Sequence, residues 1–369
     1  MVAARERVAS AQGLRVQASL GQNPRLYLQS EDIRAWGQPP FSFANSTEDY
    51  GYFGQIMETG GKRRRRVEFA GTNVERADLE RQLVERQIGY RVTAAYWTAA
   101  GASRVRDLQR ETLGTYDQLI EFQRNRVTEG VMAEADLLRT QLERDRAQVA
   151  ALNAAQEADR ALLSLFREMG RTEFASVTLT EPFEAASVVM QPDVGMAIEQ
   201  RPDLVAARQS VKQGQANVAL QRANGKPDID VLAGYKRNGG LDTLYTAVQI
   251  PLPIRNRNQG AIAAAQADVR VAQASVAAQE AAARADIETA RRAYEAQREL
   301  VERTLPAMRT RAQETSRLAR AAYREGGIDL LRLLDTERAR IEAELLYFRT
   351  VSDFRLAVLN LRAASGVTQ

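Results

Sequence analysis

The sequence has 369 residues, of which 44% are hydrophobic but only 6% aromatic, a balance that favours helices packed along their length over a thick globular core. Neither cysteine nor histidine occurs, which excludes disulfides, thiolate metal sites and histidine-dependent catalysis, and the formal net charge of +4 is too small to indicate a nucleic-acid partner. No run of about 18 consecutive apolar residues is present, so the sequence predicts no transmembrane helix.

The first half of the chain predicts helices around a pair of strands. The strands follow from alternating polar and apolar residues, and the long helix from an extended stretch without proline. At about 1.5 Å per residue, that helix would be on the order of 100 Å long. The predicted elements are a helix at Met1–Ala11, strands at Leu26–Trp36 and Tyr50–Met57, a long helix at Lys62–Arg126, and a helix returning from Gly130 to about Gly170.

The second half predicts the same order of elements. Its strands alternate as in the first half, with the turn sequence Asn-Gly-Gly between them, and its long helix is interrupted only by Pro306. Leu334, Ile341 and Phe348 lie seven residues apart in the last helix, a spacing typical of helices packed nearly parallel. The predicted elements are strands at Ile229–Lys236 and Leu244–Ile250, a long helix at Gly260–Glu325, a turn at Gly326–Gly327, and a helix to about Gly366.

The two halves also match in sequence. VAARERV from Val2 and VAARQSV from Val205 begin segments that stay aligned without a gap as far as Pro24 and Pro227. We therefore predict a duplication with repeats at 1–190 and 191–369. Their hairpins lie at about 25–58 and 228–251, and their helical turns, or tips, near 130 and 326.

Four motifs carry a family resemblance. They are LGQNPRLYL, METGGKRRRRVEFA, RPDLVAARQSV and QIPLPIRNRNQGAIAAAQADV. Together with the duplicated order of elements, they resemble the TolC-like outer-membrane efflux family. The Gly-Gly-Lys-Arg and Pro-Leu-Pro variants look most similar to the branch that serves heavy-metal pumps of the cobalt-zinc-cadmium type.

The resemblance implies a fold that is mainly α with a small β part, built from long antiparallel coiled-coil-like helices. Three protomers would each give four strands to a twelve-stranded barrel in the outer membrane of a Gram-negative bacterium. The tips would meet a periplasmic adaptor, which couples the duct to an inner-membrane pump of the RND type. The chain would need no cofactor, bind no nucleic acid and catalyse no reaction. Physical chemistry agrees, because four strands alone cannot close a barrel in lipid.

The sequence departs from the family pattern at its start. Family members carry a signal sequence, often with a lipidated cysteine, and neither is visible here. We therefore expect a truncated chain or a misplaced start codon.

The resemblance and the residue types together indicate three groups of functional residues. Glycine permits the left-handed backbone of a tight helix reversal, and rings of acids repeated by threefold symmetry would attract cations or bridge to arginine. The expected tip and adaptor contacts are Arg126, Gly130, Leu137, Gly326, Gly327 and Leu333. The expected gate residues are Asp329, Asp335 and Glu325. The expected junction between barrel and helices is Gly61, Lys62, Arg63, Arg255 and Gly260.

Two features have competing interpretations. The run Lys62–Arg66 is interpreted as the junction, facing lipid headgroups or the duct wall, ahead of a solvated charge run or a nucleic-acid patch. Because positive charge opposes the dipole at a helix start, we expect another partner to compensate it. Acid pairs at Glu143 and Asp145, and at Glu337 and Glu342, are expected on solvated helix faces rather than in a catalytic site.

The leading functional hypothesis is thus a passive exit duct for exported solutes. The alternatives are a cytoplasmic coiled-coil scaffold, in which the apparent strands would be loops, and a periplasmic adaptor. Strand faces discriminate between them. Ile229, Val231, Ala233 and Tyr235 would form an apolar face toward lipid, with Asp230 and Lys236 opposite.

Overall fold

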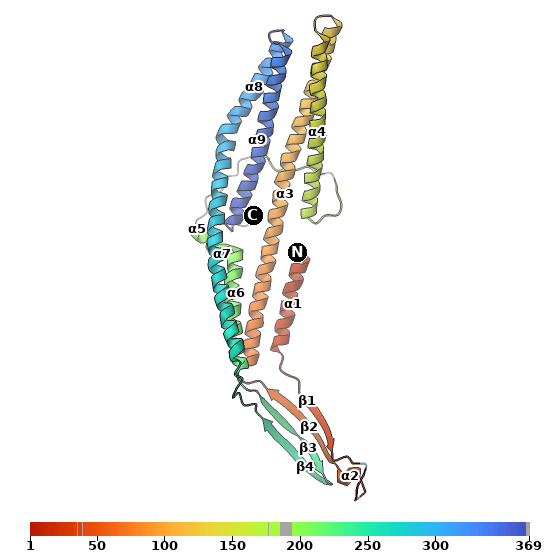
Figure 1. Cartoon of the computed structure of the whole chain (residues 1–369), viewed down its shortest axis with the longest axis vertical. Helices are drawn as coiled ribbons and strands as arrows, with labels where there is room; N and C mark the ends of the chain where they lie inside the picture. The colour runs from red at the N-terminus through yellow and green to blue at the C-terminus, as the bar shows by residue number, and fades with distance from the viewer. Residues whose placement is uncertain (35, 39, 176, 185–193, 367–369) are drawn as a thin grey trace. The chain divides into compact units, whose positions relative to one another are not determined.

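The computed structural model describes residues 1–34, 36–38, 40–175, 177–184 and 194–366. The chain divides into two compact units (Figure 1). Unit 1 combines Met1–Val84 with Pro202–Glu280, and unit 2 combines Glu85–Arg201 with Ala281–Gln369. Each unit therefore takes one piece from each half of the sequence. The compact units are not the two predicted repeats, and the duplication remains a prediction about the sequence.

Unit 1 contains a four-stranded sheet and a group of helices. Two of its helices, α3 and α7, continue into unit 2. Its elements are α1 (Val2–Ser19), β1 (Arg25–Glu31), α2 (Phe43–Ser46), β2 (Glu48–Met57), the start of α3 (Lys62–Thr128), α6 (Pro202–Asn224), β3 (Ile229–Asn238), β4 (Leu241–Gln249) and the start of α7 (Gln259–Glu299).

The sheet is antiparallel throughout and has the order β1-β2-β3-β4. Its centre joins the two halves of the sequence, since β2 pairs with β3 from Met57↔Ile229 to Glu48↔Asn238. A tight turn at Gly239 and Gly240, both with positive φ, connects β3 to β4. Both predicted hairpins are thus confirmed, although β1 ends at Glu31 rather than at Trp36. Asp32 follows with a φ of 58°, a left-handed conformation that cannot continue a strand.

Small residues allow the helices of unit 1 to pack closely. The buried positions in its helices are mainly alanines, including Ala4, Ala18, Ala70 and Ala265. Gly214 of α6 faces Val269 of α7 so closely that an added Cβ would lie 3.0 Å from the valine methyl. Alanine also has the highest helix propensity, so the same composition favours the helices and their close contact.

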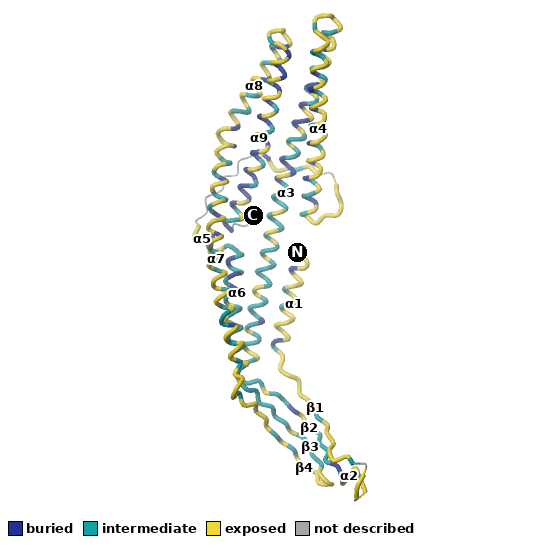
Figure 2. Tube along the Cα trace, viewed as in Figure 1, coloured by how far each residue is buried: buried dark blue, intermediate teal, exposed yellow. Residues whose placement is uncertain are grey.

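Unit 2 is helical and holds the larger apolar core. One cluster includes Trp97, Tyr294, Val351 and Phe354, and a second lies near the helical turns around Tyr116 and Leu333. Figure 2 shows many of the buried positions along these helices, whereas the sheet of unit 1 is mostly intermediate or exposed. The elements are the rest of α3 and α7, with α4 (Glu134–Glu168), α5 (Val194–Gln200), η1 (Leu300–Thr304), α8 (Leu305–Arg324) and α9 (Leu330–Ala364).

The second long helix differs from its prediction. A single π-helical turn, η1, separates α7 from α8, and Pro306 follows at the start of α8. Proline lacks a backbone N–H and its ring clashes with the preceding turn, so a wider turn before it relieves the conflict. The first long helix has no proline and runs unbroken for 67 residues.

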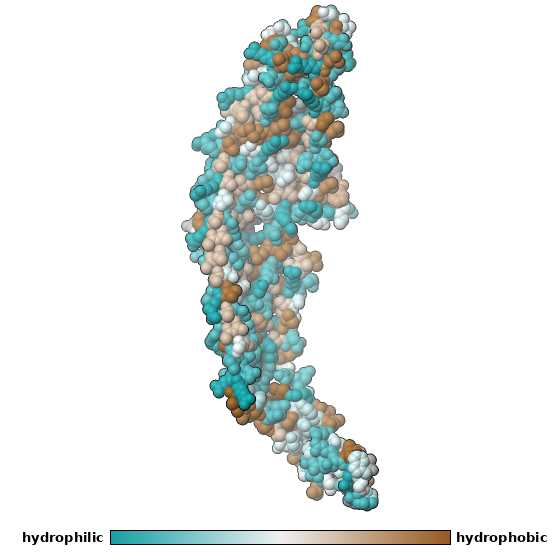
Figure 3. All heavy atoms as spheres, in the orientation of Figure 1, coloured by the Kyte–Doolittle hydropathy of each residue, from teal (hydrophilic) through white to brown (hydrophobic). Residues whose placement is uncertain are grey.

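Among the described residues, none of the helices is both long enough and apolar enough to span a membrane. Hydrophilic and hydrophobic residues alternate over the helices on the face drawn in Figure 3.

Candidate functional sites: sheet, junction and helical turns

One face of the sheet is apolar and exposed. Residues directly opposite each other in an antiparallel sheet point to the same side, so the register defines the two faces. One row runs Leu26, Phe53, Ala233 and Thr246, and the next runs Leu28, Gly51, Tyr235 and Leu244. Leu28 is 78% exposed and Leu244 is 89% exposed. The predicted apolar face with Ala233 and Tyr235 is therefore present, and no described residue of unit 1 covers these two leucines.

The opposite face is polar and carries a row of tyrosines. Tyr27 stacks on Tyr52 with ring centroids 4.8 Å apart, and Tyr245 lies 5.2 Å from Tyr52. Lys236 lies over the ring of Tyr50 at 4.9 Å and pairs with Glu48 at 3.0 Å. This face therefore combines rings with charged groups, as expected of a surface that contacts water.

Gly234 makes room for the tyrosine row. It lies between Tyr52 and Tyr245 in the register. A Cβ at this position would collide with the carbonyl oxygen of Gly51 and with the backbone of Tyr52. Backbone atoms cannot move aside as a flexible side chain can, so only glycine fits here.

The arginine run beside the sheet has a partner that the sequence did not reveal. Arg66 donates to the carbonyl oxygens of Ala18 and Leu20 at 3.0 and 2.9 Å, and Arg63 donates to that of Ser19. These carbonyls end helix α1, where the helix dipole is negative. The positive charge at the start of α3 is thus compensated by the end of α1, as the dipole argument required.

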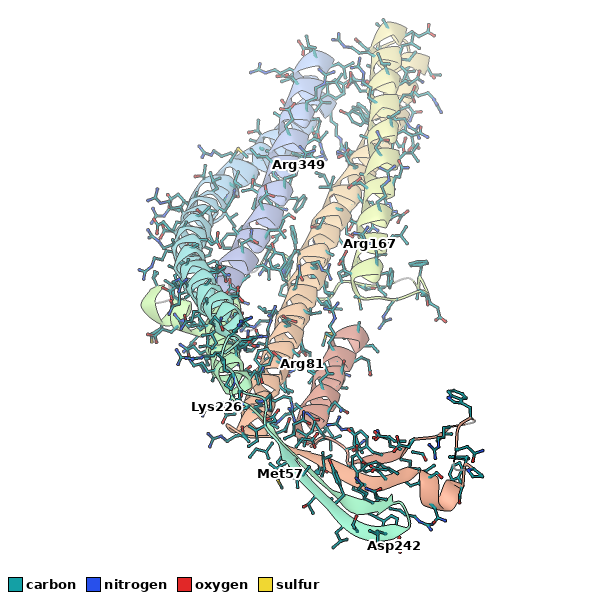
Figure 4. All side chains as sticks on the ribbon, turned by 60° about the horizontal axis from the view of Figure 1, so that its bottom comes forward. Met57, Arg81, Arg167, Lys226, Asp242 and Arg349 are labelled. Carbon is teal, nitrogen blue, oxygen red and sulfur yellow. The ribbon has the colours of Figure 1, made fainter. Side chains whose placement is uncertain are left out.

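The other junction residues connect the helices to the sheet. Lys62 pairs with Asp228 at 2.8 Å, immediately before β3. Gly61 has a φ of 72°, which allows the chain to reverse into α3. Arg255 and Gly260 are both exposed, and the carbonyl of Arg255 accepts a bond from Gln259 at 3.1 Å. Met57 and Lys226 lie at this end of the sheet and Asp242 at the other (Figure 4).

Two helical turns in unit 2 share one geometry. Gly130 and Gly326 have φ values of 73° and 78°. In each turn, the residue after the glycine donates back to a carbonyl five residues earlier, Val131 to Arg126 at 3.0 Å and Gly327 to Ala322 at 2.7 Å. This is the Schellman arrangement, which ends a helix on a left-handed residue. Both glycines are confirmed as turn residues.

Three other residues predicted at the helical turns stabilise the local structure. Arg126 lies 5.6 Å from the ring centre of Phe122, and Leu333 is only 1% exposed, in the cluster with Tyr116. Asp329 caps α9 by accepting a bond from the Arg332 amide at 2.8 Å. The remaining candidates lie at or near the surface: Leu137, Gly327, Glu325 and Asp335.

Two contacts, one buried and one half-buried, join the α3–α4 hairpin to the α8–α9 hairpin close to these turns. Gln123 donates to the hydroxyl of Tyr323 at 2.8 Å, linking α3 to α8. Arg338 donates to Glu143 at 2.6 Å, linking α9 to α4. We call this pair of contacts the hairpin ties. The partners lie 200 and 195 positions apart, and no sequence signal joins residues at such a separation, so sequence reasoning missed both contacts.

The expected solvation of Glu143 and Glu337 is wrong. They are 8% and 3% exposed, whereas Asp145 and Glu342 are exposed as predicted. Glu337 accepts bonds from Ser316 and Arg320 and pairs with Arg340 at 3.1 Å. Burial alone would raise the pKa of Glu337, but the bonds from Arg320 and Ser316, with the charges of Arg320 and Arg340, lower it below its ordinary value. Buried carboxylates persist here because arginines surround them.

Comparison with known proteins agrees with this architecture. The family described as "Outer membrane efflux protein" matches residues 1–171 and 194–367.

Curated relatives match at lower identity. Over 275 residues the chain is 27% identical to the nickel-cobalt-cadmium resistance protein NccC of Alcaligenes xylosoxydans xylosoxydans, covering 74% of this chain and 61% of that protein. It is 24% identical to the cobalt-zinc-cadmium resistance protein CzcC of Cupriavidus metallidurans, covering 94% and 81% of the two chains. The match thus spans less than two thirds of NccC.

Solved structures share the fold. The open-state MtrE outer membrane channel of Neisseria gonorrhoeae superposes with a TM-score of 0.80 at 20% identity, over 99% of this chain and 86% of that one.

Proposed function

We propose that this chain, which belongs to the outer membrane efflux protein family, is one subunit of a passive channel through which a tripartite efflux system exports solutes. Its location is the outer membrane. The observation that carries the proposal is the sheet of unit 1, with an exposed apolar face, a polar tyrosine face and two edge strands, β1 and β4.

The edge strands support assembly into a trimer. An unpaired backbone group in lipid costs several kcal/mol, so neither edge can face the bilayer alone. Because neighbouring strands alternate in direction, β4 of one copy lies antiparallel to β1 of the next when copies follow one another around a ring. Three copies then give a twelve-stranded barrel. The apolar face with Leu28 and Leu244 would contact lipid, and the tyrosine face would line the lumen.

The helical turns are proposed as the contact with a periplasmic adaptor, which links the channel to an inner-membrane pump of the RND type. Their shared Schellman geometry supports a common role, since it presents two similar exposed ends. Leu333 is buried, so it would not contact the adaptor directly but would hold the turn in place through its packing. The proposed contacts are Arg126, Gly130, Leu137, Gly326, Gly327 and Leu333.

The channel entrance is proposed to be held closed near the same turns. The hairpin ties support this, because they fix one hairpin against the other where an opening motion would separate them. Asp329, Asp335 and Glu325 remain proposed gate residues, and for Asp329 the capping bond is an additional role. Opening would be a shift between two populations, biased by the adaptor or pump.

The junction between the sheet and the helices is proposed to lie at the membrane surface. The exposed members of the junction, including Arg255 and Gly260, are proposed to lie near lipid headgroups.

The family is one of efflux channels, and we infer that the chain catalyses no reaction, since its buried carboxylates are held by arginines. A coiled-coil scaffold or an adaptor would have no use for the two distinct faces of the sheet.

The proposed cargo is divalent heavy-metal cations. The names of NccC and CzcC specify nickel, cobalt, cadmium and zinc resistance, and the identity to them extends over most of this chain. A passive duct needs no soft metal ligands, so the lack of cysteine and histidine is compatible with this cargo.

Disulfide cross-linking tests the ring of strands, because the sequence has no cysteine of its own. Leu28→Cys in β1 is combined in turn with Leu244→Cys, Thr246→Cys and Val248→Cys in β4, all on the apolar face. Oxidation in detergent extracts of outer membranes is expected to give covalent dimers and trimers for at least one pair.

The matched control is Leu26→Cys with Phe53→Cys, which are register partners within one chain. This pair should close inside the subunit and leave it monomeric on a denaturing gel. If the control closes while all three β1–β4 pairs remain monomeric, the proposed channel is wrong.

A further inference from the structure

Unit 2 contains a groove with an unusual number of arginines. Its cavity volume is about 670 Å³, and its lining residues come from α3, α8 and α9. Figure 1 shows these three helices next to one another in the unit. Three carboxylates, Asp107, Glu111 and Glu344, line the groove, against six arginines: Arg104, Arg309, Arg317, Arg320, Arg324 and Arg340.

The carboxylates around the groove neutralise only some of these arginines. Asp107 pairs with Arg106, outside the groove. Arg309 pairs with Glu344 at 2.8 Å and with Glu184 at 3.5 Å, and Arg317 pairs with Glu314 at 2.6 Å. Glu337 neutralises at most one charge, yet Arg320 and Arg340 both bind it. Glu111, the remaining acid, has no ion pair within the described part of the chain. The lining itself holds six arginines and three carboxylates, a formal net charge of +3, which Glu314 and Glu337 next to it offset in part.

Three of the guanidinium groups have donors without acceptors. Arg104 and Arg324 both line the groove and are exposed, and they form no hydrogen bond or ion pair with any described residue. Arg340 is 6% exposed, and its Nη2 is buried without a hydrogen-bond partner among the described residues. Burying a charged donor without an acceptor is unfavourable, so an anion near Arg340 would relieve this cost.

We propose that this groove is a binding site for a small phosphate-class oxyanion, a property beyond the channel function. The guanidinium fork donates two parallel hydrogen bonds to such oxygens, and several forks from different helices surround one anion better than lysines would. Binding would join α3 to α8 and α9 within unit 2.

Calorimetric titration of the detergent-purified full chain with inorganic pyrophosphate tests the site. We expect saturable binding that weakens at higher salt. Arg104→Gln and Arg324→Gln are each expected to weaken it about tenfold, the effect of losing one charge-assisted hydrogen bond. Both side chains are exposed and unpaired, so neither change should disturb folding.

Arg311→Gln is the matched control, since Arg311 is also exposed on α8 but does not line the groove. Its affinity should equal that of the unmodified chain. Absence of pyrophosphate binding, or equal weakening by Arg311→Gln, would overturn the proposal. Binding of micelles that contain phosphatidylglycerol, without binding of pyrophosphate, would also overturn the proposal, because the ligand would then be a lipid surface and not a free anion. The pyrophosphate titration does not depend on the β1–β4 cross-linking test, so the two proposals can fail separately.

Discussion

Consecutive arginines at the start of α3 have different environments, although the sequence presents them as one run. Arg66 contacts two carbonyls of α1 and also Glu58, at 2.6 Å. Arg64 is 70% exposed and reaches Glu68 only at 3.7 Å. The same residue type therefore joins two helices at one position and remains in solvent two positions earlier.

Replacing each arginine by alanine is expected to separate these roles. Arg66→Ala removes charged hydrogen bonds to the end of α1 and should lower the free energy of unfolding by about 1–2 kcal/mol. Arg64→Ala removes only a surface pair and should change it by less than about 0.5 kcal/mol. Urea unfolding of the detergent-solubilised chain measures both, and equal effects would show that Arg66 does not hold α1.

Glu337 makes stability depend on pH. Its pKa in the folded chain is lowered, so the carboxylate favours folding above its ordinary value of 4.5, and this contribution disappears as the pH falls below that value. Glu337→Gln is expected to cost about 3 kcal/mol at pH 7, because it leaves the buried Arg340 and the half-buried Arg320 without their anion. At pH 3 the cost should be clearly smaller.

Unfolding curves at the two pH values, with Glu342→Gln as the control, check this expectation. Glu342 is exposed on the same helix, so its loss should have little effect at either pH. A cost of Glu337→Gln that does not change with pH would mean that packing, and not charge, explains the effect.

At the scale of elements, local pattern determined what could be predicted. The alternation of polar and apolar residues predicted the strands. The presence of glycine predicted the turns at Gly130 and Gly326, because both positions need a left-handed backbone. Long-range partners could not be predicted in the same way. The pairing of Glu143 with Arg338, and of Arg66 with the end of α1, depends on tertiary contacts that leave no local periodicity.

The hairpin ties give a test of the proposed gate. Arg338→Gln and Tyr323→Phe each remove one contact between the hairpins, which should favour the open population by about tenfold per tie lost. Leak conductance in planar bilayers should therefore rise for each variant and rise further for the double variant. Arg349→Gln is the control, because Arg349 is exposed on α9 (labelled in Figure 4) and forms no tie. Unchanged conductance in the double variant would remove the ties from the gate.

At the scale of the whole molecule, sequence order and spatial grouping differ. The two predicted repeats follow one another along the chain, yet the sheet pairs β2 with β3 across their boundary, and each compact unit draws on both halves of the sequence. Sequence patterns can predict repeats because each repeat is contiguous. They cannot predict the units, which depend on where the long helices α3 and α7 pass from one group of contacts to another.

The proposed cargo is tested in a cell. In a Gram-negative host that has a cobalt-zinc-cadmium pump and adaptor but lacks their outer-membrane component, this chain, made with an export signal, is expected to restore growth on all three metals. Gly234→Ala is the negative control, since its Cβ would collide with the neighbouring strand and prevent the sheet from forming. Gly71→Ala is the positive control, because its Cβ would meet no atom within 4 Å. The cells that contain the cross-linked trimer could instead regain tolerance of organic toxins without tolerance of metals. That outcome would support the proposed channel and refute the proposed metal cargo.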